Sequence, residues 1–530
     1  MRNFILIPLI VLLAACGQTY QAKAPQKTHY VTVLHTNDHH GRFWHNKDGE
    51  YGMAARKTLI DRLRAEAKSK DHIVLLLSGG DINTGVPESD LQYAEPDFKG
   101  MRLLNYDAMA IGNHEFDNPL HVLDKQIEWA QFPVLSANIL NKADDSYAYQ
   151  PYTIIKQQGL NIAVLGLTTT DTTKIANPEY LKALKFISPT QATQRVLAEI
   201  KSQHHIDLAI AVTHMGHYHN AVYGINAPGD VTLARNLAAG QLDMIIGGHS
   251  QEPICVDKQG NDNPHFSPGK ACHPDQQNGT WIMQAHEWGK YVGRAVFKIT
   301  DGKKSLLSYE LIPVNLKDEQ GNFIADYIEH NQEMLDLLTP FQAIGEGQLK
   351  ETVGSTDAYL DGKRDTVRFK QSPLARLIIK AQKEAVNADF GFISGGGIRH
   401  SISAGEISAK DILKVHPFKN KISLMQWRGS ALVHYLNVIT AFPVDAGAYL
   451  QYEGISFDRV NGKVGNIKIN GQPFNPEATY RMSINSYNAS GGDGYPILLN
   501  KKGYQETKLI DADVLTTYIQ RHSPIKVNSL

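Results

Sequence analysis

Short apolar runs alternate with amphipathic segments through the first half of the chain. The runs that predict buried strands lie at residues 30–36, 72–78, 108–112, 132–138, 161–167, 207–213 and 243–248. Between them, residues 56–70 and 189–203 have apolar positions three and four apart, which predicts helices. Strands that are apolar at nearly every position are typical of a sheet covered on both faces. The pattern therefore predicts a layered α/β domain with helices over a largely buried sheet.

The second half begins with a change of character around residue 316. A charged, helix-patterned stretch predicts a linker helix over 331–350, ended by Pro340 and the glycine-containing stretch after it. A helix that belongs to the first domain fits almost as well. A smaller α/β pattern then runs to the end of the chain. A length of 530 residues favours several domains, and we expect a catalytic domain at 29–330 and a substrate-binding domain at 351–530.

The first residues have the pattern of an export signal. Arg2 precedes an apolar run that is short for a membrane span, and small residues then lead to Cys16. The sequence LAAC resembles a bacterial lipoprotein cleavage box, which implies removal of residues 1–15, lipidation of Cys16 and a polar tether over 16–28. A plain secretory signal is the alternative. We expect attachment to the bacterial cell envelope, at the outer membrane, through this lipid anchor alone.

Two further cysteines, Cys255 and Cys272, follow in the exported part of the chain. An even pair in an oxidising compartment predicts a disulfide. A metal site built with His273 is the alternative, but it lacks the paired short spacings of zinc sites. The net charge of −1, from 53 basic and 54 acidic residues, provides no basic surface for a nucleic acid polymer.

Polar side chains follow five of the predicted strands, at the point where each strand ends. They are Asp38, His40, Asp81, Asn113, His114, His214, His249 and Gln251. Each alone has an ordinary explanation: a single histidine is commonly structural, Asp38 could cap a helix, and Asn113 could be a turn residue. Together they favour a site for two divalent cations that share a carboxylate. The metal could be Zn, Mn, Mg or Co.

The motifs D-x-H at 38–40, G-G-D at 79–81, G-N-H-E at 112–115, His214 and G-H-x-Q at 248–251 resemble the calcineurin-like metallophosphoesterases. The match is closest to the bacterial 5′-nucleotidase and UDP-sugar hydrolase family, and it runs to the end of the chain. The resemblance implies a β-sandwich flanked by helices. It assigns one ion to Asp38, His40, Asp81 and Gln251. It assigns the other ion to Asp81, Asn113, His214 and His249, so that Asp81 is the bridge.

His114 of the third motif and Asp117, three residues further along the chain, are predicted to form a catalytic pair. His114 is left without an ion, and Asp117 is placed to accept a hydrogen bond from its imidazole. A positioned imidazolium would stabilise charge on the phosphoryl oxygens while a metal-activated water attacks directly. The alternative is that His114 only supports the metal site.

Substrate selection is expected from the second domain. Arg364 and Arg368 lie four apart, in a helix or a loop, and Arg399 follows three glycines. Guanidinium groups bind phosphates in forked pairs. From spacing alone, these could also be solvated arginines, and the aromatic residues Phe418 and Tyr487 could belong to the core. The resemblance implies instead that nucleotides are bound by Arg364, Arg368, Arg399, Phe418, Asn420, Tyr487 and Asp493.

These observations predict a monomeric, metal-dependent 5′-nucleotidase that acts on AMP, ADP, ATP and UDP-sugars. Three alternatives remain open: a 2′,3′-cyclic nucleotide phosphodiesterase with 3′-nucleotidase activity, a binding protein without turnover, and a hydrolase of sugar phosphates or peptidoglycan-related substrates. Comparing AMP with a cyclic nucleotide separates the first alternative from the prediction.

Overall fold

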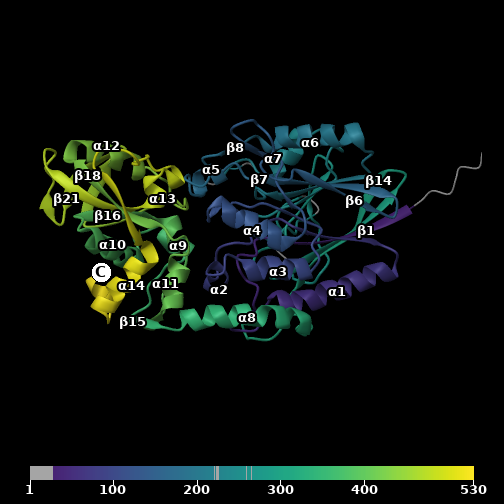
Figure 1. Ribbon diagram of the computed structural model, residues 1–530, viewed down its shortest axis with the longest axis horizontal. Coiled ribbons are helices and arrows are strands. Elements are labelled where there is room, and N and C mark those ends of the chain that lie inside the picture. The colour runs from purple at the N-terminus through teal and green to yellow at the C-terminus, as the bar shows by residue number, and fades with distance from the viewer. Residues whose placement is uncertain (1–27, 220, 222–225, 258–259, 264–265) are drawn as a thin grey trace, which may run out of the picture.

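The computed structural model describes residues 28–219, 221, 226–257, 260–263 and 266–530. It contains two domains that lie side by side, and the colours of Figure 1 separate them into a purple-to-teal half and a green-to-yellow half. The C-terminus lies in the smaller second domain. Cys16, its signal and most of its tether fall outside the described residues. Within the described ranges, no helix is long and apolar enough to cross a membrane.

Two six-stranded sheets form the centre of the first domain. The first has the order β14-β13-β1-β2-β3-β4, with β1 (Thr28–Thr36), β2 (Ile73–Ser78), β3 (Ala108–Ala110), β4 (Val134–Leu135), β13 (Tyr291–Thr300) and β14 (Lys303–Pro313). The second has the order β11-β12-β10-β9-β7-β6, with β6 (Tyr152–Gln157), β7 (Leu160–Thr168), β9 (Leu208–His214), β10 (Met244–Ile246), β11 (Asp275–Gln277) and β12 (Thr280–Met283). A small pair, β5 (Ile139–Asn141) and β8 (Leu184–Phe186), lies beside them.

The two sheets pack face to face as a sandwich, and every run predicted as a strand contains one. Leu75 and Leu77 of β2 join a cluster with residues of the second sheet, whereas Leu76 between them faces a helix-lined cluster. On β9, Val212 points inward and Ala211 outward in the same way. Both faces of these strands are buried, which is why their sequences are continuously apolar.

Helices cover the outer faces of the sandwich. They are α1 (Met53–Ser69), α2 (Pro87–Asp90), α3 (Glu95–Leu103), α4 (Leu120–Ala130), α5 (Thr172–Ile175), α6 (Pro189–Gln203) and α7 (Asp230–Asn236), with the short 3₁₀ turn η1 (His114–Phe116). The two predicted helices are confirmed as α1 and α6. Leu59 and Ile60 of α1 pack on the first sheet, and Val196 and Ile200 of α6 pack on the second.

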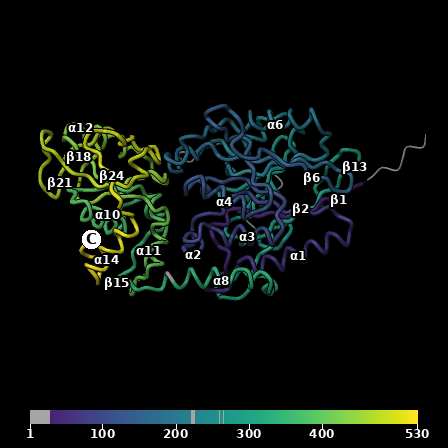
Figure 2. The backbone as a smooth tube through the Cα atoms, viewed as in Figure 1, coloured from purple at the N-terminus to yellow at the C-terminus, as the bar shows by residue number. Residues whose placement is uncertain are grey.

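A long helix, α8 (Gln332–Leu349), runs along one edge of the molecule toward the second domain (Figures 1 and 2). The Asn331 side chain caps it by accepting a hydrogen bond from the Met334 N–H at 2.9 Å. The expectation that Pro340 ends the helix is wrong, because the helix continues through Pro340. Proline removes one backbone donor, and packing of α8 against α1, α2 and α3 maintains the helix beyond it.

The second domain is built on a five-stranded sheet with the order β19-β16-β23-β18-β24. The strands of the whole domain, including those outside this sheet, are β15 (Thr352–Thr356), β16 (Phe390–Ser394), β17 (Gly405–Ser408), β18 (Lys421–Arg428), β19 (Leu450–Glu453), β20 (Ile455–Val460), β21 (Lys463–Ile469), β22 (Gln472–Pro473), β23 (Thr479–Asn485) and β24 (Tyr504–Ile510). Its helices are α9 (Arg364–Val367), α10 (Pro373–Val386), α11 (Ala409–Val415), α12 (Gly429–Ile439), α13 (Ser486–Ala489) and α14 (Asp511–His522), with η2 (Gly395–Gly397), η3 (Gly492–Gly494) and η4 (Val527–Ser529). This smaller α/β domain agrees with the prediction.

The structure holds Cys255 and Cys272 as free, buried thiols, so it does not contain the predicted disulfide. The two side chains share one apolar cluster with β1 and β9. Burial and the neighbouring Cys255 thiol raise the pKa of Cys272, because an apolar setting favours the neutral thiol. The two thiols are neighbours in one buried cluster, and the disulfide itself stays a prediction.

Candidate metal centre and substrate cavity

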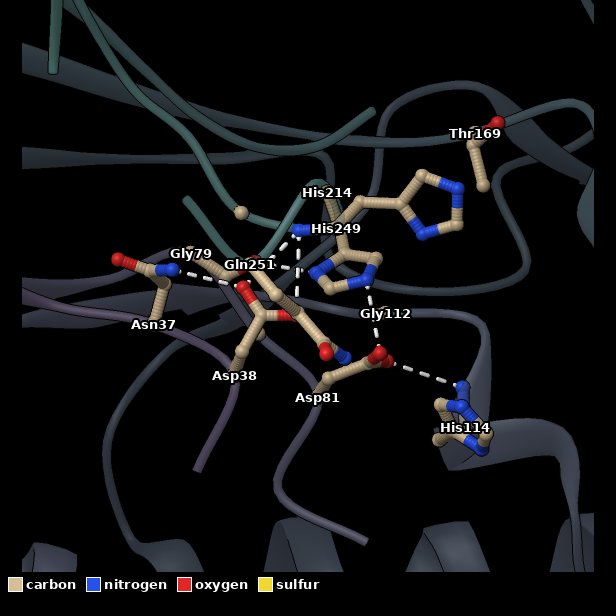
Figure 3. A network of polar contacts seen from close by, with 12 residues as sticks. Asn37, Asp38, Gly79, Asp81, Gly112, His114, Thr169, His214, His249 and Gln251 are labelled. Carbon is tan, nitrogen blue, oxygen red and sulfur yellow. Dashed lines mark hydrogen bonds and ion pairs between the residues drawn. The ribbon is translucent and has the colours of Figure 1, made fainter. Parts of the chain in front are cut away.

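The predicted metal ligands meet at one end of the sandwich, where strands of both sheets terminate. Asp38 and His40 follow β1, Asp81 follows β2, and Asn113 follows β3 in the first sheet. In the second sheet His214 ends β9, and His249 and Gln251 follow β10. Figure 3 shows the side chains of Asp38, Asp81, His214 and His249 converging from these separate loops. Strand ends in layered α/β folds are a common place for such sites.

The backbone at these loops is held in an uncommon conformation. The left-handed φ angles are 50° at Asp38, 51° at His40, 56° at Asp81, 81° at His249 and 58° at Gln251. Residues with a Cβ adopt this region at a cost, and they concentrate at functional sites where the surroundings enforce it. With this backbone conformation, the loops orient these side chains toward one site.

Glycines let the ligand loops approach one another closely. A Cβ on Gly112 would stand 2.1 Å from Asp81 Oδ1, and a Cβ on Gly79 would stand 2.2 Å from the Gly247 carbonyl oxygen. Neither position has room for another residue type, so the ligand loops could not come this close without these glycines.

Two overlapping groups of side chains have spacings suited to metal ions. Ligand atoms of Asp81, His214 and His249 lie within 4.8 Å of one another, and so do those of Asp81, His40 and His114. Asp81 belongs to both groups, which is the arrangement expected of a bridging carboxylate. Its Oδ2 lies 2.9 Å from His214 Nε2 and 3.9 Å from His40 Nε2.

Backbone carbonyls fix which ring nitrogen each histidine presents. His214 Nδ1 donates to the Gly79 carbonyl at 2.7 Å, and His40 Nδ1 donates to the Thr84 carbonyl at 2.9 Å. This leaves Nε2 of both rings for a metal. Gln251 contacts His40 Nε2 through its amide nitrogen at 2.8 Å, and rotation of that amide would present its oxygen instead.

The charge balance of the centre also fits a cation. Burial raises the pKa of Asp38 to about 7. Although burial lowers the pKa of His214, the carboxylates of Asp81 and Asp38 raise it to about 10, so that its imidazolium balances them. Burial, together with His214, lowers the pKa of His249 to about 3 and leaves this ring neutral, which is its metal-binding form.

Asn113 provides an independent test of whether the residues fit a metal. Its Oδ1 is buried and has no hydrogen-bond partner among the residues that the structure describes. A buried carbonyl oxygen without a partner costs roughly 1–3 kcal/mol. A cation beside Asp81 and His214 would satisfy it, so the donor set and this oxygen together fit divalent metal ions.

His114 and Asp117 form the predicted pair. His114 Nδ1 donates to Asp117 Oδ2 at 2.6 Å, and the His114 backbone N–H donates to Asp81 Oδ1 at 3.0 Å. Although burial lowers the pKa of His114, the carboxylates of Asp117 and Asp81 raise it to about 9. The ring is therefore a cation at neutral pH, and it lines a cavity.

The cavity has a volume of about 880 Å³ and lies between the two domains. On the metal side it is lined by Asp81, Asn113, His114, Asp117, His249 and Gln251. On the opposite side it is lined by every residue predicted to bind substrate, namely Arg364, Arg368, Arg399, Phe418, Asn420, Tyr487 and Asp493. Cavities that hold ligands of nucleotide size have similar volumes.

The second-domain residues reach the metal side directly. The Phe418 ring lies nearly parallel to the His114 ring, with centroids 6.3 Å apart. The Arg399 guanidinium lies 5.6 Å from the centroid of the Phe418 ring. Arg364 begins α9, and its exposed side chain lies 3.2 Å from Asp445. The structure thus brings the predicted arginines and metal ligands around one space.

Comparisons with known proteins agree with this geometry. Residues 31–253 match the calcineurin-like phosphoesterase family, and residues 352–500 match the 5′-nucleotidase C-terminal domain family. A 5′-nucleotidase of Vibrio cholerae is 52% identical over 536 aligned residues, covering 100% of this chain and 97% of that protein. The chain belongs to the bacterial 5′-nucleotidase family.

Further relatives of this 5′-nucleotidase family member align with most or all of its length. The Escherichia coli protein UshA is 51% identical and covers 100% of this chain and 98% of its own. The crystal structure of a 5′-nucleotidase precursor from Thermus thermophilus is 27% identical, with a TM-score of 0.72, and covers 93% of this chain and 96% of that one. The similarity to this crystal structure thus extends over both domains of the chain.

Several residues at the site of this 5′-nucleotidase family member were not predicted from the sequence. The buried Glu115 carboxylate accepts backbone N–H bonds from Ile82 at 2.8 Å and Gly112 at 2.7 Å, which holds the loop of Asp81. Tyr218 and Glu252 line the cavity from the first domain. Glu115 completes the G-N-H-E motif and could have been found there, whereas Tyr218 has no comparable signal.

Proposed function

We propose that this protein hydrolyses 5′-nucleotides to nucleosides and phosphate at a centre of two divalent cations. One observation carries the proposal: a single cavity is lined both by the metal-centre residues and by all the residues expected to bind a nucleotide. A phosphate at the metal side leaves the base within reach of the second domain.

The lining residues divide by chemistry into three parts. The guanidinium groups of Arg364, Arg368 and Arg399 suit the phosphate. The Phe418 and Tyr487 rings suit a base held between them, and the Asp493 carboxylate and the Asn420 amide suit ribose hydroxyls and base edges. Metal ions at Asp81 would polarise the phosphoryl group and lower the pKa of the attacking water.

His114 supplies the remaining group that the reaction requires. Its ring lines the cavity next to Asn113, and Asp117 fixes its orientation through the 2.6 Å hydrogen bond. A donor so placed stabilises negative charge that develops on the phosphoryl oxygens. The described residues of the cavity include no serine or cysteine in a strand-to-helix nucleophile turn, so direct attack by water is the simpler route.

UDP-sugar hydrolysis is proposed as a second activity of the same centre. Tyr218 and Glu252 line the same cavity as the metal ligands, and the part of the cavity next to them could receive the group that leaves with the second phosphate. The relative UshA aligns over the whole chain.

The test is phosphate release from AMP, ATP, UDP-glucose and 2′,3′-cyclic AMP by purified protein. The protein is stripped with chelator and supplied with one metal at a time, and bound metal is counted by elemental analysis. We expect two ions per chain, restored turnover of AMP and ATP, and no turnover of the cyclic ester. Turnover of the cyclic ester alone would assign the protein to the phosphodiesterases, and binding without turnover would refute an enzymatic function.

We also propose a lipid anchor on Cys16, attachment at the outer membrane, a monomeric state and a disulfide between Cys255 and Cys272. Support for the anchor is the cleavage-box sequence, and support for the disulfide is the shared burial of the two thiols. Mass spectrometry of protein from envelope fractions measures acylation and the loss of two thiol protons, and light scattering measures the oligomeric state. An N-terminus elsewhere than Cys16 would refute the anchor.

A further inference from the structure

Thr84 lies between the metal centre and the catalytic pair in an unfavourable backbone conformation. Its φ angle is 63°, in the left-handed region. A β-branched residue is a genuine outlier there, because its Cβ substituents crowd the backbone. The residue is buried, with 8% of its surface exposed. A strained residue that persists in a site points to a use for its side chain.

The Thr84 hydroxyl bonds directly to the catalytic pair. Thr84 Oγ1 donates to Asp117 Oδ2 at 2.6 Å. Asp117 Oδ2 also accepts a hydrogen bond from His114 Nδ1, at 2.6 Å. Two short donors on one carboxylate oxygen prevent that carboxylate from rotating, and they fix the plane of the imidazole that it orients.

The Thr84 carbonyl bonds to the metal side. It accepts a hydrogen bond from His40 Nδ1 at 2.9 Å, which leaves His40 Nε2 for a metal. A single residue therefore contacts a metal ligand through its backbone and Asp117 through its side chain.

Neighbouring contacts hold Thr84 in place. The amides of Asn83 and Gln126 exchange hydrogen bonds at 2.7 and 3.1 Å, and the Asn83 N–H donates to Glu115 at 3.3 Å. On the other side the Gly85 N–H donates to the Asp90 carboxylate at 3.2 Å. The loop around Thr84 is therefore fixed at both ends, as a positioning element must be.

We infer that Thr84 is a positioning residue, which aligns the His114–Asp117 pair with the metal centre through His40. The inference rests on the proposed phosphatase activity. Without the hydroxyl, Asp117 keeps one donor and can turn, so that His114 reaches the transition state less often in the productive orientation. Misplacement of a catalytic group by about 1 Å commonly costs about 10²-fold in rate.

The test compares Thr84→Val, Thr84→Ser and Thr84→Gly in the full-length protein, with AMP and saturating metal. Valine keeps the shape and the strain but removes the hydroxyl, whereas glycine removes the hydroxyl and the strain together. We expect kcat to fall about 10–10²-fold in both variants, with KM within about threefold of wild type. Serine should retain wild-type kcat. Bound metal and melting temperature are measured for each variant.

The outcomes separate this inference from the proposed function. Inactive wild-type protein refutes the proposed function before any variant is compared. If the wild-type protein is active and the Thr84→Val and Thr84→Gly variants are equally active, the proposed role of Thr84 is overturned. A serine variant as impaired as valine also overturns it, because the hydroxyl would then be irrelevant. If valine fails to fold, glycine carries the same comparison without backbone strain.

Discussion

Individual buried charges at the metal centre depend on specific neighbours. Asp38 is fully buried and accepts hydrogen bonds from the Asn37 amide at 2.7 Å and the His249 N–H at 3.0 Å. Asn37 in turn accepts from the Ala285 N–H at 2.7 Å. A buried carboxylate without such donors would be protonated rather than available to a cation. The residues next to the ligands therefore determine whether the ligands can function.

Replacing His114 tests the catalytic pair at the residue scale. We expect His114→Ala to lower kcat for AMP about 10²–10⁴-fold, the typical contribution of a positioned acid or charge. Metal content should be unchanged, because Asn113, Asp81 and His214 remain. The matched control is His121→Ala, which removes an exposed histidine of α4. Retained kcat, or loss of metal in step with activity, would contradict the assigned role.

Glu115 offers a second test at the same scale. In Glu115→Gln, an amide N–H₂ replaces one carboxylate oxygen and faces backbone N–H donors of the Asp81 loop. Leaving these buried donors unpaired should lower the free energy of unfolding by about 1–3 kcal/mol. Denaturant unfolding measures the change against Glu128→Gln, an exposed residue of α4. Equal stability of the two variants would show that the Glu115 contacts contribute little.

The sequence was sufficient to predict candidate ligands that the fold brings together, but not the residues that orient them. Asp38, Asp81 and His249 could be predicted because polar residues directly after apolar strands stand out. Thr84 could not, because its role depends on a left-handed φ and on contacts with residues 33 and 44 positions away. Such contacts follow from loop geometry, which local patterns do not encode.

At the scale of elements, α8 connects the domains and packs closely on α2. A Cβ on Gly345 would stand 2.7 Å from the Glu88 Cβ. Glu88 is buried under the helix and pairs with Lys410 of α11 in the second domain. The close approach of α8 and α2 thus places a buried carboxylate where it contacts the other domain. The same packing explains why the helix continues beyond Pro340.

Two glycines of α8 give opposite predictions. Gly345→Ala should lower the melting temperature and weaken the contact with Lys410, because the added methyl group collides with Glu88. Gly347→Ala should raise the free energy of unfolding by about 0.5–1 kcal/mol, since alanine favours helix and its Cβ would meet no described atom within 4 Å. Calorimetry of both variants measures this. A change of the melting temperature in the same direction in both variants would contradict the described packing.

At the scale of the whole molecule, catalysis and recognition come from separate domains that share one cavity. The fold class of each domain could be predicted from its pattern of strands and helices. Their relative placement could not, because it depends on side-chain contacts such as that of the Tyr487 hydroxyl, which donates to the Lys174 carbonyl of the first domain at 3.2 Å. This contact joins an expected base-binding residue to the catalytic domain.

Whole-molecule stability should depend on pH through buried histidines. His35 is fully buried on Tyr309, and neither ring nitrogen has a hydrogen-bond partner among the described residues. Burial lowers the pKa of His35 to about 3, and that of His416 to about 4. Both pKa values lie below the unfolded value of 6.5, so the unfolded chain binds more protons as the pH falls below 6.5.

The contribution of these two histidines to the free energy of unfolding should therefore decrease as the pH falls from 6.5 toward 4, by about 1.4 kcal/mol per pH unit for each group. Urea unfolding at several pH values measures the slope. His35→Phe keeps a flat ring above Gly293 and removes one titrating group, so its slope should be smaller by that amount. An unchanged slope would show that His35 does not contribute.

The central claim is that the metal centre performs the chemistry while the aromatic pair of the second domain selects the nucleotide. The most direct measurement is kcat/KM for AMP and for ribose 5-phosphate, which lacks the base, in the variant Phe418→Ala/Tyr487→Ala. The exposed aromatic pair Phe323→Ala/Tyr327→Ala is the control. Because each stacked base contact contributes about 1–3 kcal/mol, we predict about a 10²-fold loss for AMP and little change for ribose 5-phosphate. Equal losses for both esters, or none for AMP, would contradict the separation of recognition from catalysis.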